Sequence, residues 1–218
     1  MRIVEAEDVA AAAAAFLADR LRGLTADGRP ASIAVSGGTT PWPMLAALAK
    51  VDLPWDRIDI YQVDERIAPA GDPARNLTRL AEIFASVPAA LHPMPVEASD
   101  LDGAAADYAT TLPPVLDIVQ LGLGGDGHTA SLVPGDPVLD VTDRDVAVTE
   151  PYQGHRRMTL TYPAINRAGL ILWLVAGAGK SEALAALLAG DPNIPAGRIG
   201  QDQAVLFADS AALGSGRL

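Results

Sequence analysis

Residues 121–131, Leu-Gly-Leu-Gly-Gly-Asp-Gly-His-Thr-Ala-Ser, combine a glycine-rich backbone with two side chains that can move protons. Asp126 and His128 lie two positions apart, and His128 is one of only three histidines in the chain. Imidazole titrates near neutral pH and can take a proton from water, while a neighbouring carboxylate can fix its tautomer. The apolar, β-branched run at 115–121 predicts a buried strand directly before this segment. We therefore expect Asp126 and His128 at the carboxyl end of a parallel sheet, where open α/β sheets bind ligands.

The glycines of this segment allow two other interpretations. Gly122, Gly124 and Gly127 match the G-x-G-x-x-G pattern of dinucleotide-binding loops, which hold a pyrophosphate on backbone amides at a helix N-terminus. Asp126 would place a carboxylate beside that phosphate, and the prolines that follow from position 134 would end the next helix within about two turns. A dinucleotide loop and a purely structural turn are the alternatives to a catalytic loop.

The composition sets the class of protein. The chain has 218 residues, 50% of them hydrophobic, which is enough for a single domain over residues 1–218 with a full core. Its net charge of −11 disfavours nucleic acid as a partner, because phosphate backbones require a basic surface. No basic leader with an apolar core starts the chain, and no apolar run reaches the ~18 residues of a membrane span. We expect a cytoplasmic protein without membrane association, and the lack of cysteine excludes disulfides, thiol nucleophiles and Cys-based metal sites.

Strand and helix signals alternate along the whole chain. This pattern predicts a single-domain α/β fold: a mostly parallel, open, twisted sheet with helices on both faces, similar to a Rossmann fold. The expected strands are residues 31–35, 58–63, 115–121, 146–149, 158–161, 170–175 and 204–208. The expected helices are residues 7–24, 43–49, 77–86, 101–111 and 181–188, with Asn76 and either Ser99 or Asp100 as N-caps.

A second polar cluster follows the strand at 31–35. Bare backbone amides and hydroxyl groups ahead of a helix favour a loop that binds an anion such as phosphate. The residues of this loop are Ser36, Gly37, Gly38, Thr39 and Thr40. The alternative is a Ser/Thr-rich helix cap without a ligand.

Charged side chains follow or flank three other strands. After 58–63 comes Asp64-Glu65-Arg66, in which the planar guanidinium of Arg66 suits a carboxylate or phosphate and Asp64 or Glu65 could orient it. A structural ion-pair cluster is the alternative there. Arg157 lies at the start of the strand at 158–161, and Lys180, one of two lysines, precedes the helix at 181–188. A cation at a helix N-terminus opposes the helix dipole, so Lys180 indicates either an anionic ligand or a solvated side chain.

These motifs, in this order, resemble one known family. They are Ser-Gly-Gly-Thr-Thr-Pro at 36–41, Val-Asp-Glu-Arg at 63–66, Asn76, the segment 121–132, Arg-Met-Thr-Leu-Thr at 157–161, and Gly177-x-x-Lys180. The chain resembles the 6-phosphogluconolactonases, within the broader group that includes glucosamine-6-phosphate deaminases. The resemblance runs from about residue 30 to residue 190 and is far more specific than any single loop.

The resemblance implies hydrolysis of 6-phospho-D-glucono-1,5-lactone to 6-phosphogluconate in the oxidative pentose phosphate pathway, with neither metal nor organic cofactor. It assigns His128 as general base, with Asp126 and Arg66 as its neighbours. Arg157 and Lys180 correspond to phosphate-binding cations. The loop at 36–40 corresponds to the sugar-phosphate loop, with Asp64 and Asn76 as further substrate contacts. The expected partner is thus a small sugar-phosphate lactone, with no nucleic acid, membrane or obligate protein partner.

Two positions depart from the family pattern. Arg75 stands where a serine usually precedes Asn76, so that this extra cation could contact phosphate or lie in solvent. Val133 replaces a common aromatic residue.

A deaminase, the first alternative function, typically has an acidic residue at the position of Val133 and Asp-Glu-Tyr at positions 64–66. A non-catalytic sugar-phosphate sensor is the second alternative, but this acidic chain has no basic helix-turn-helix segment.

Other catalytic routes find less support in the sequence. A covalent route through Ser36 or Ser131 lacks the Gly-x-Ser-x-Gly elbow that exposes a nucleophilic serine. No His-Glu-x-x-His pair is present for zinc. We expect His92 to be structural or on the surface, and His155 to lie at the rim of the site.

Overall fold

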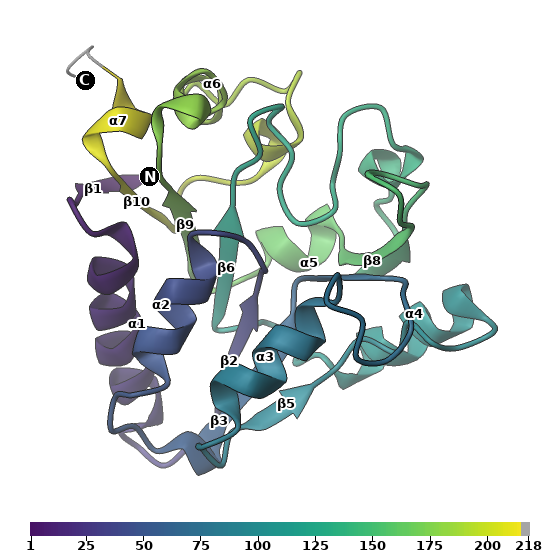
Figure 1. Ribbon diagram of the computed structural model, residues 1–218, viewed down its shortest axis with the longest axis horizontal. Coiled ribbons are helices and arrows are strands. Elements are labelled where there is room, and N and C mark those ends of the chain that lie inside the picture. The colour runs from purple at the N-terminus through teal and green to yellow at the C-terminus, as the bar shows by residue number, and fades with distance from the viewer. Residues whose placement is uncertain (215–218) are drawn as a thin grey trace.

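A seven-stranded sheet forms the centre of the molecule in the computed structural model, which describes residues 1–214 (Figure 1). Its order is β1-β10-β9-β6-β2-β3-β5, and every neighbouring pair is parallel. The strands are β1 (Arg2–Glu5), β2 (Ala31–Val35), β3 (Ile58–Gln62), β5 (Ala90–His92), β6 (Ile118–Gly122), β9 (Ile171–Val175) and β10 (Ala204–Ala208). The predicted strands at 31–35 and 204–208 are confirmed with the same bounds, and those at 58–63, 115–121 and 170–175 with small shifts. The short strands β1 and β5 were not predicted.

The other two predicted strands belong to a separate, antiparallel sheet. This sheet has the order β4-β8-β7 and consists of β4 (Asp64–Arg66), β7 (Val146–Val148) and β8 (Arg157–Leu160). The assignment of 146–149 and 158–161 to the parallel sheet was therefore wrong. The physical reason is the connection: β7 and β8 are joined by a hairpin with a two-residue tip, which suits antiparallel neighbours, whereas parallel neighbours need a long crossover.

Helices cover both faces of the parallel sheet, as predicted. They are α1 (Val9–Thr25), α2 (Pro41–Leu48), α3 (Asn76–Phe84), α4 (Leu101–Thr111), α5 (Tyr162–Asn166), α6 (Ser181–Leu188) and α7 (Ser210–Leu213), with 3-10 helices η1 (Trp55–Arg57), η2 (Pro137–Asp140), η3 (Ala178–Lys180) and η4 (Pro195–Arg198). The buried residues of α1, α2 and α3 share one core cluster, and those of α4, α5 and α6 share the other (Figure 1). Within residues 1–214, no helix has the length and apolarity needed to cross a membrane.

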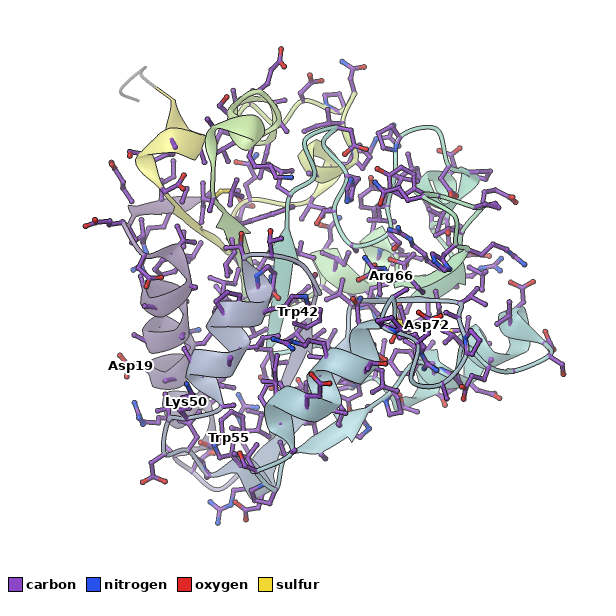
Figure 2. All side chains as sticks on the ribbon, viewed as in Figure 1. Asp19, Trp42, Lys50, Trp55, Arg66 and Asp72 are labelled. Carbon is purple, nitrogen blue, oxygen red and sulfur yellow. The ribbon has the colours of Figure 1, made fainter. Side chains whose placement is uncertain are left out.

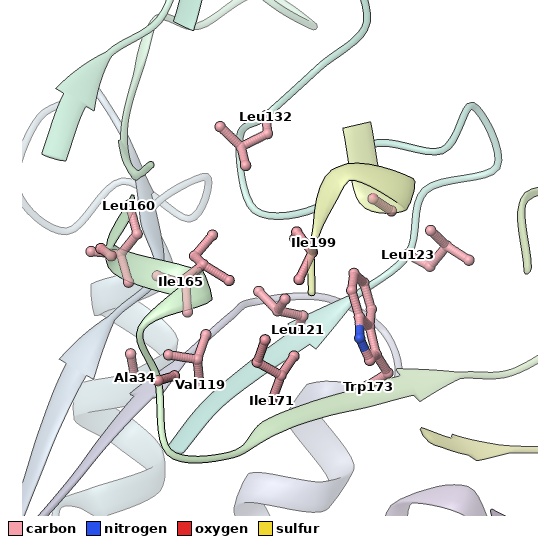
Figure 3. Close-up of a cluster of buried hydrophobic side chains, with 14 of the residues drawn as sticks. Ala34, Val119, Leu121, Leu123, Leu132, Leu160, Ile165, Ile171, Trp173 and Ile199 are labelled. Carbon is pink, nitrogen blue, oxygen red and sulfur yellow. The ribbon is translucent and has the colours of Figure 1, made fainter. Parts of the chain in front are cut away.

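The central strands are buried on both sides, which explains their nearly continuous apolar sequences. Along β9, Ile171 and Trp173 pack in the cluster shown in Figure 3, together with Leu121 of β6 and Ile165 of α5. Leu172, the residue between Ile171 and Trp173, packs in the opposite cluster beneath α1 and α2. Each fully buried large apolar side chain stabilises the fold by about 1.5–3 kcal/mol.

The strand order reverses in the middle of the sheet. From β2 the chain builds outward through β3 to β5, whereas β6 pairs with the other side of β2 and leads to β9 and β10. The connections at such a reversal leave in opposite directions, which opens a crevice at the carboxyl ends of the two strands. The glycine-rich segments that follow β2 and β6 therefore meet at this crevice.

Candidate active site

A cleft of about 200 Å³ lies at this point and gathers nearly all of the predicted site residues. Its lining includes Ser36, Gly37, Gly38, Thr39, Thr40, Asp64, Arg66, Asn76, His128, Arg157 and Lys180. Asp126, the remaining predicted site residue, contacts His128 instead of lining the cleft. Figure 2, in which Arg66 is labelled, shows this side chain near β8. Residues up to 144 positions apart in sequence are thus brought to one place, from Ser36 to Lys180.

His128 and Asp126 form a hydrogen-bonded pair. The Nδ1 atom of His128 lies 2.5 Å from Oδ1 of Asp126, and the Tyr152 hydroxyl donates to Oδ2 at 3.0 Å. Burial alone would raise the pKa of Asp126, but the hydrogen bonds from His128 and Tyr152 outweigh it and hold the pKa below its usual value. An ionised carboxylate only accepts hydrogen bonds, so Nδ1 carries the ring proton of neutral His128. Its Nε2 then has the free lone pair that a general base needs.

The backbone around this pair requires glycine. The Gly124 N–H donates to the His128 carbonyl at 2.8 Å, and a Cβ atom at Gly124 would collide with His128 Nδ1. Gly127 has φ of +80° and packs against Ile194. The chain then turns through a bridge between Thr129 and Leu132, and the next helical element in the described chain is η2. Because no helix N-terminus follows the glycines directly, the segment lacks the feature on which a dinucleotide loop depends.

The loop after β2 is tied to β6. The Ser36 hydroxyl donates to the Gln120 carbonyl and the Ser36 N–H to Gln120 Oε1, both at 3.0 Å. A Cβ at Gly37 would overlap Asn76 Oδ1 and the Trp42 ring, so the loop approaches α3 only because position 37 is glycine. Thr40 is the N-cap residue of α2, yet its side chain makes no capping hydrogen bond. At Thr40 the structure therefore does not support the alternative of a helix cap without a ligand.

Glu65, which the sequence offered as a possible partner of Arg66, organises one wall of the cleft. It is fully buried, and its carboxylate accepts hydrogen bonds from Gln62 Nε2 at 2.8 Å and from three backbone N–H groups. The N–H groups are those of Arg66 at 2.8 Å, Asn76 at 2.7 Å and Leu77 at 2.7 Å. The prediction that Asn76 caps α3 was wrong by one position: Arg75 is the N-cap residue, and the Glu65 carboxylate satisfies the helix N-terminus instead. Asp100 is confirmed as the N-cap of α4.

Because Glu65 caps α3, the side chain of Asn76 can bind Arg66. The Nη1 atom of Arg66 donates to Asn76 Oδ1 at 3.3 Å and to the Ala74 carbonyl at 2.7 Å, while Asn76 Nδ2 donates to the Asp64 carbonyl at 3.0 Å. Within residues 1–214, Arg66 makes no ion pair with Asp64 or Glu65. Asn76 thus orients Arg66, a role for which the sequence offered Asp64 or Glu65. The Nε atom of Arg66 is buried with no hydrogen-bond partner in the described part of the chain.

Arg157 lies next to Arg66. The two residues are register partners in the pair of β4 and β8, and Arg157 is only 4% exposed. Burial lowers the pKa of Arg157, the nearby Asp64 raises it, and Arg66 lowers it further. Like Arg66, Arg157 has a buried Nε without a partner in residues 1–214. Two adjacent guanidiniums with buried, unsatisfied donors favour an anionic ligand, because buried polar groups are nearly always hydrogen-bonded.

Three other residues lie outside the cleft lining. Arg75 is 4% exposed, with Nη1 3.1 Å from Glu97 Oε1 and Nε 3.7 Å from Glu65 Oε2, so it neither lines the cleft nor lies in solvent. His92 binds Asp59 at 2.7 Å, which confirms the structural interpretation. His155 does not line the cleft, contrary to the expectation of a rim position; its backbone closes a turn with Tyr152.

Fold and site together define an α/β protein in which an Asp–His pair and several cations meet at the switch point of a parallel sheet. Residues 4–207 match the model of the family described as glucosamine-6-phosphate isomerases/6-phosphogluconolactonase. The chain belongs to this family.

Individual relatives agree with this membership. The chain is 41% identical over 192 residues to a protein of Synechocystis sp. named 6-phosphogluconolactonase, in an alignment that covers 81% of this chain and 80% of the relative. The crystal structure of 6-phosphogluconolactonase from Thermotoga maritima is similar with a TM-score of 0.86 at 26% identity, over 95% of this chain and 98% of that one. A monomeric glucosamine-6-phosphate deaminase matches with a TM-score of 0.85 at 20% identity, over 98% of this chain and 99% of that one. The fold is therefore common to both branches, and the sequence relatives confirm the resemblance to lactonases.

Proposed function

We propose that this protein hydrolyses 6-phospho-D-glucono-1,5-lactone to 6-phosphogluconate, the lactone step of the oxidative pentose phosphate pathway, with His128 as the general base. The observation that carries the proposal is the Asp126–His128 pair at a cleft lined by Arg66, Arg157 and Lys180. Six relatives that are named 6-phosphogluconolactonase, at 35–41% identity, support the substrate.

The proposed chemistry uses the free Nε2 of His128. This nitrogen removes a proton from water while the water oxygen attacks the lactone carbonyl carbon, forming a tetrahedral oxyanion. The guanidinium of Arg66 stabilises that oxyanion, because its charge and donors are fixed in place before the reaction. Collapse of the intermediate breaks the bond between the carbonyl carbon and the ring oxygen, and protonated His128 returns the proton to that oxygen. The ionised Asp126 stabilises the imidazolium that exists between the two transfers.

The substrate phosphate is held by Lys180, Arg157 and the loop at 36–40, which line the same cleft as His128. Lys180 lies directly before α6, and the loop lies directly before α2, so that both face the positive end of a helix dipole. Arg157 adds a guanidinium next to Arg66, which makes the cationic surface continuous between the phosphate and the reacting carbon. Binding at a remote phosphate orients the lactone and turns an encounter with His128 into a positioned reaction.

The deaminase alternative finds no support at position 133. Val133 is buried and offers no carboxylate where the deaminase branch has an acidic residue, and Arg66 stands in place of that branch's tyrosine. The non-catalytic sensor finds little support either, since both members of the Asp126–His128 pair are present and in contact.

Acid release measured with a pH-stat tests the proposal. Freshly prepared 6-phosphogluconolactone should release acid faster with the purified protein than in its absence, and faster than with a matched double variant, Asp126→Ala with His128→Ala. Ammonia release from glucosamine 6-phosphate should be undetectable. Acid release no faster than with the double variant would contradict the proposed function, and ammonia release would assign the protein to the deaminases.

We also propose that the protein acts in the cytoplasm, without a metal or organic cofactor and without an obligate protein partner. The activity of a purified, chelator-treated sample and the distribution of the protein after cell fractionation test these points. Loss of activity after chelation, with recovery when a metal is added, would contradict the cofactor-free mechanism.

A further inference from the structure

We infer that Tyr152 is a positioning residue for the catalytic pair: its hydroxyl holds one carboxylate oxygen of Asp126 so that the other faces His128. The inference rests on the proposed function, since it concerns the same His128. Tyr152 lies outside the cleft lining and was not among the predicted site residues.

The contacts of the Asp126 carboxylate are divided between its two oxygens. Oδ1 lies 2.5 Å from His128 Nδ1, and Oδ2 accepts the Tyr152 hydroxyl at 3.0 Å. Oδ1 also accepts the His128 backbone N–H at 3.2 Å, so Tyr152 is the partner of Oδ2 alone. The side chain of Asp126 is 40% exposed, so without the Tyr152 hydroxyl Oδ2 would be left to water. Burial and the neighbouring Asp126 raise the pKa of Tyr152, which keeps its hydroxyl protonated and able to donate. Tyr152 thus fixes the orientation of the Asp126 carboxylate, which in turn orients the His128 ring.

A tight turn sets the position of Tyr152. The Tyr152 N–H donates to the His155 carbonyl at 2.9 Å, and the His155 N–H donates back at 3.3 Å. Between them, Gln153 has φ of 49° and Gly154 has φ of 87°, the positive values that a type I′ turn requires at both central positions. Gln153 is a non-glycine residue in this region, which proteins retain mainly where the surroundings enforce it. Its Nε2 atom lies 3.2 Å from the Tyr152 hydroxyl oxygen and donates to it.

The ring of Tyr152 also joins the catalytic pair to Arg157. Its edge meets the His128 ring with centroids 5.6 Å apart and planes at 65°. The Arg157 guanidinium carbon lies 5.0 Å from the centre of the same ring, and Nη2 donates to the Tyr152 carbonyl at 3.4 Å. The aromatic ring therefore packs against both side chains, while only the hydroxyl binds Asp126. A variant that removes the hydroxyl alone separates these two roles.

Tyr152→Phe keeps the ring and removes the hydroxyl. We expect kcat for 6-phosphogluconolactone to fall about 3- to 10-fold with KM changed less than about twofold, because one hydrogen bond to a partly exposed carboxylate is lost and substrate contacts remain. The matched control is Tyr61→Phe, which also removes one hydroxyl, from a hydrogen bond to the Thr111 carbonyl far from the pair. The control should leave both constants unchanged. A kcat of Tyr152→Phe within error of the native value would overturn the inference, as would a loss confined to KM.

A double-mutant cycle tests whether Tyr152 acts through Asp126. In an Asp126→Ala background, the hydroxyl has no carboxylate to hold, so adding Tyr152→Phe should lower kcat no further. An equal additional loss in that background would show that Tyr152 acts by another route.

A third readout does not depend on activity. The chain has three histidines, so the ring nitrogen resonances of His128 can be resolved by NMR. Tyr152→Phe should shift the His128 ring nitrogens and leave those of His92 unchanged, because His92 binds Asp59 elsewhere in the fold. Unchanged His128 resonances would overturn the inference, whether or not the protein is a lactonase. A shift of these resonances in a protein without lactonase activity would contradict only the proposed function.

Discussion

Replacing the buried Glu65 carboxylate by an amide should destabilise the fold strongly. In the native protein, Oε1 accepts the N–H groups of Arg66 and Asn76, while Oε2 accepts Leu77 N–H and the Gln62 side-chain amide. Glu65→Gln leaves one accepting oxygen and turns an NH₂ group toward two donors. Gln62 cannot relieve the conflict by rotating its amide, because its Oε1 already accepts the Met94 N–H at 2.8 Å.

The expected magnitude follows from the two donors that lose their acceptor. Each buried donor left unsatisfied costs about 1–3 kcal/mol, so the free energy of unfolding should fall by about 2–6 kcal/mol. For a chain of this size, each kcal/mol lowers Tm by about 2–4 °C, which gives a decrease of roughly 4–24 °C.

Urea unfolding followed by tryptophan fluorescence measures this loss directly. Glu97→Gln is the matched control, because Glu97 also pairs with Arg75 but its side chain is 55% exposed, and an exposed pair contributes less than about 1 kcal/mol. If Glu65→Gln unfolds within 1 kcal/mol of the native protein (about the cost of one hydrogen bond), the carboxylate does not organise this wall as described.

Two further substitutions separate the roles of the cations. Lys180→Ala should lower kcat/KM for the phosphorylated lactone on the order of 10–100-fold, the value of one charge-assisted hydrogen bond, with little effect on unphosphorylated gluconolactone. Equal losses on both substrates would show that Lys180 does not bind phosphate. Arg66→Lys keeps the charge but loses the planar fork, so kcat should fall about 10- to 100-fold on both lactones if Arg66 stabilises the oxyanion. A loss restricted to the phosphorylated lactone would assign Arg66 to the phosphate, and a lower Tm with unchanged kcat would make its role structural.

The parallel sheet was predictable because its central strands are apolar on both faces and bounded by clear helix signals. The strand at 31–35 was predicted at its observed bounds for this reason. The second sheet was not, because β4 consists of Asp64, Glu65 and Arg66, three charged residues that do not look like a strand. Its carboxylates are accommodated by hydrogen bonds from the N-terminus of α3 to Glu65 and from the Ser131 hydroxyl to Asp64.

The site was predictable where its residues directly follow the ends of parallel strands. The rule that polar clusters after parallel strands meet at one edge placed His128, the 36–40 loop and Lys180 together, and the cleft confirms that they are neighbours. The catalytic and binding roles assigned to them stay predictions. Two contributors were missed for different reasons. The role of Glu65 depends on which backbone amides surround it after folding, and Tyr152 gave one weak signal, the Gln153-Gly154 turn.

The most direct test of the account is the rate constant of a variant without the proposed base. His128→Ala should lower kcat for 6-phosphogluconolactone by about 10²–10⁴-fold with a much smaller change in KM, since proton transfer occurs in the transition state and phosphate contacts are retained. His92→Gln, which removes another histidine from outside the cleft, serves as the control and should keep its kcat. A folded His128→Ala protein with near-native kcat would contradict the central claim that His128 activates water.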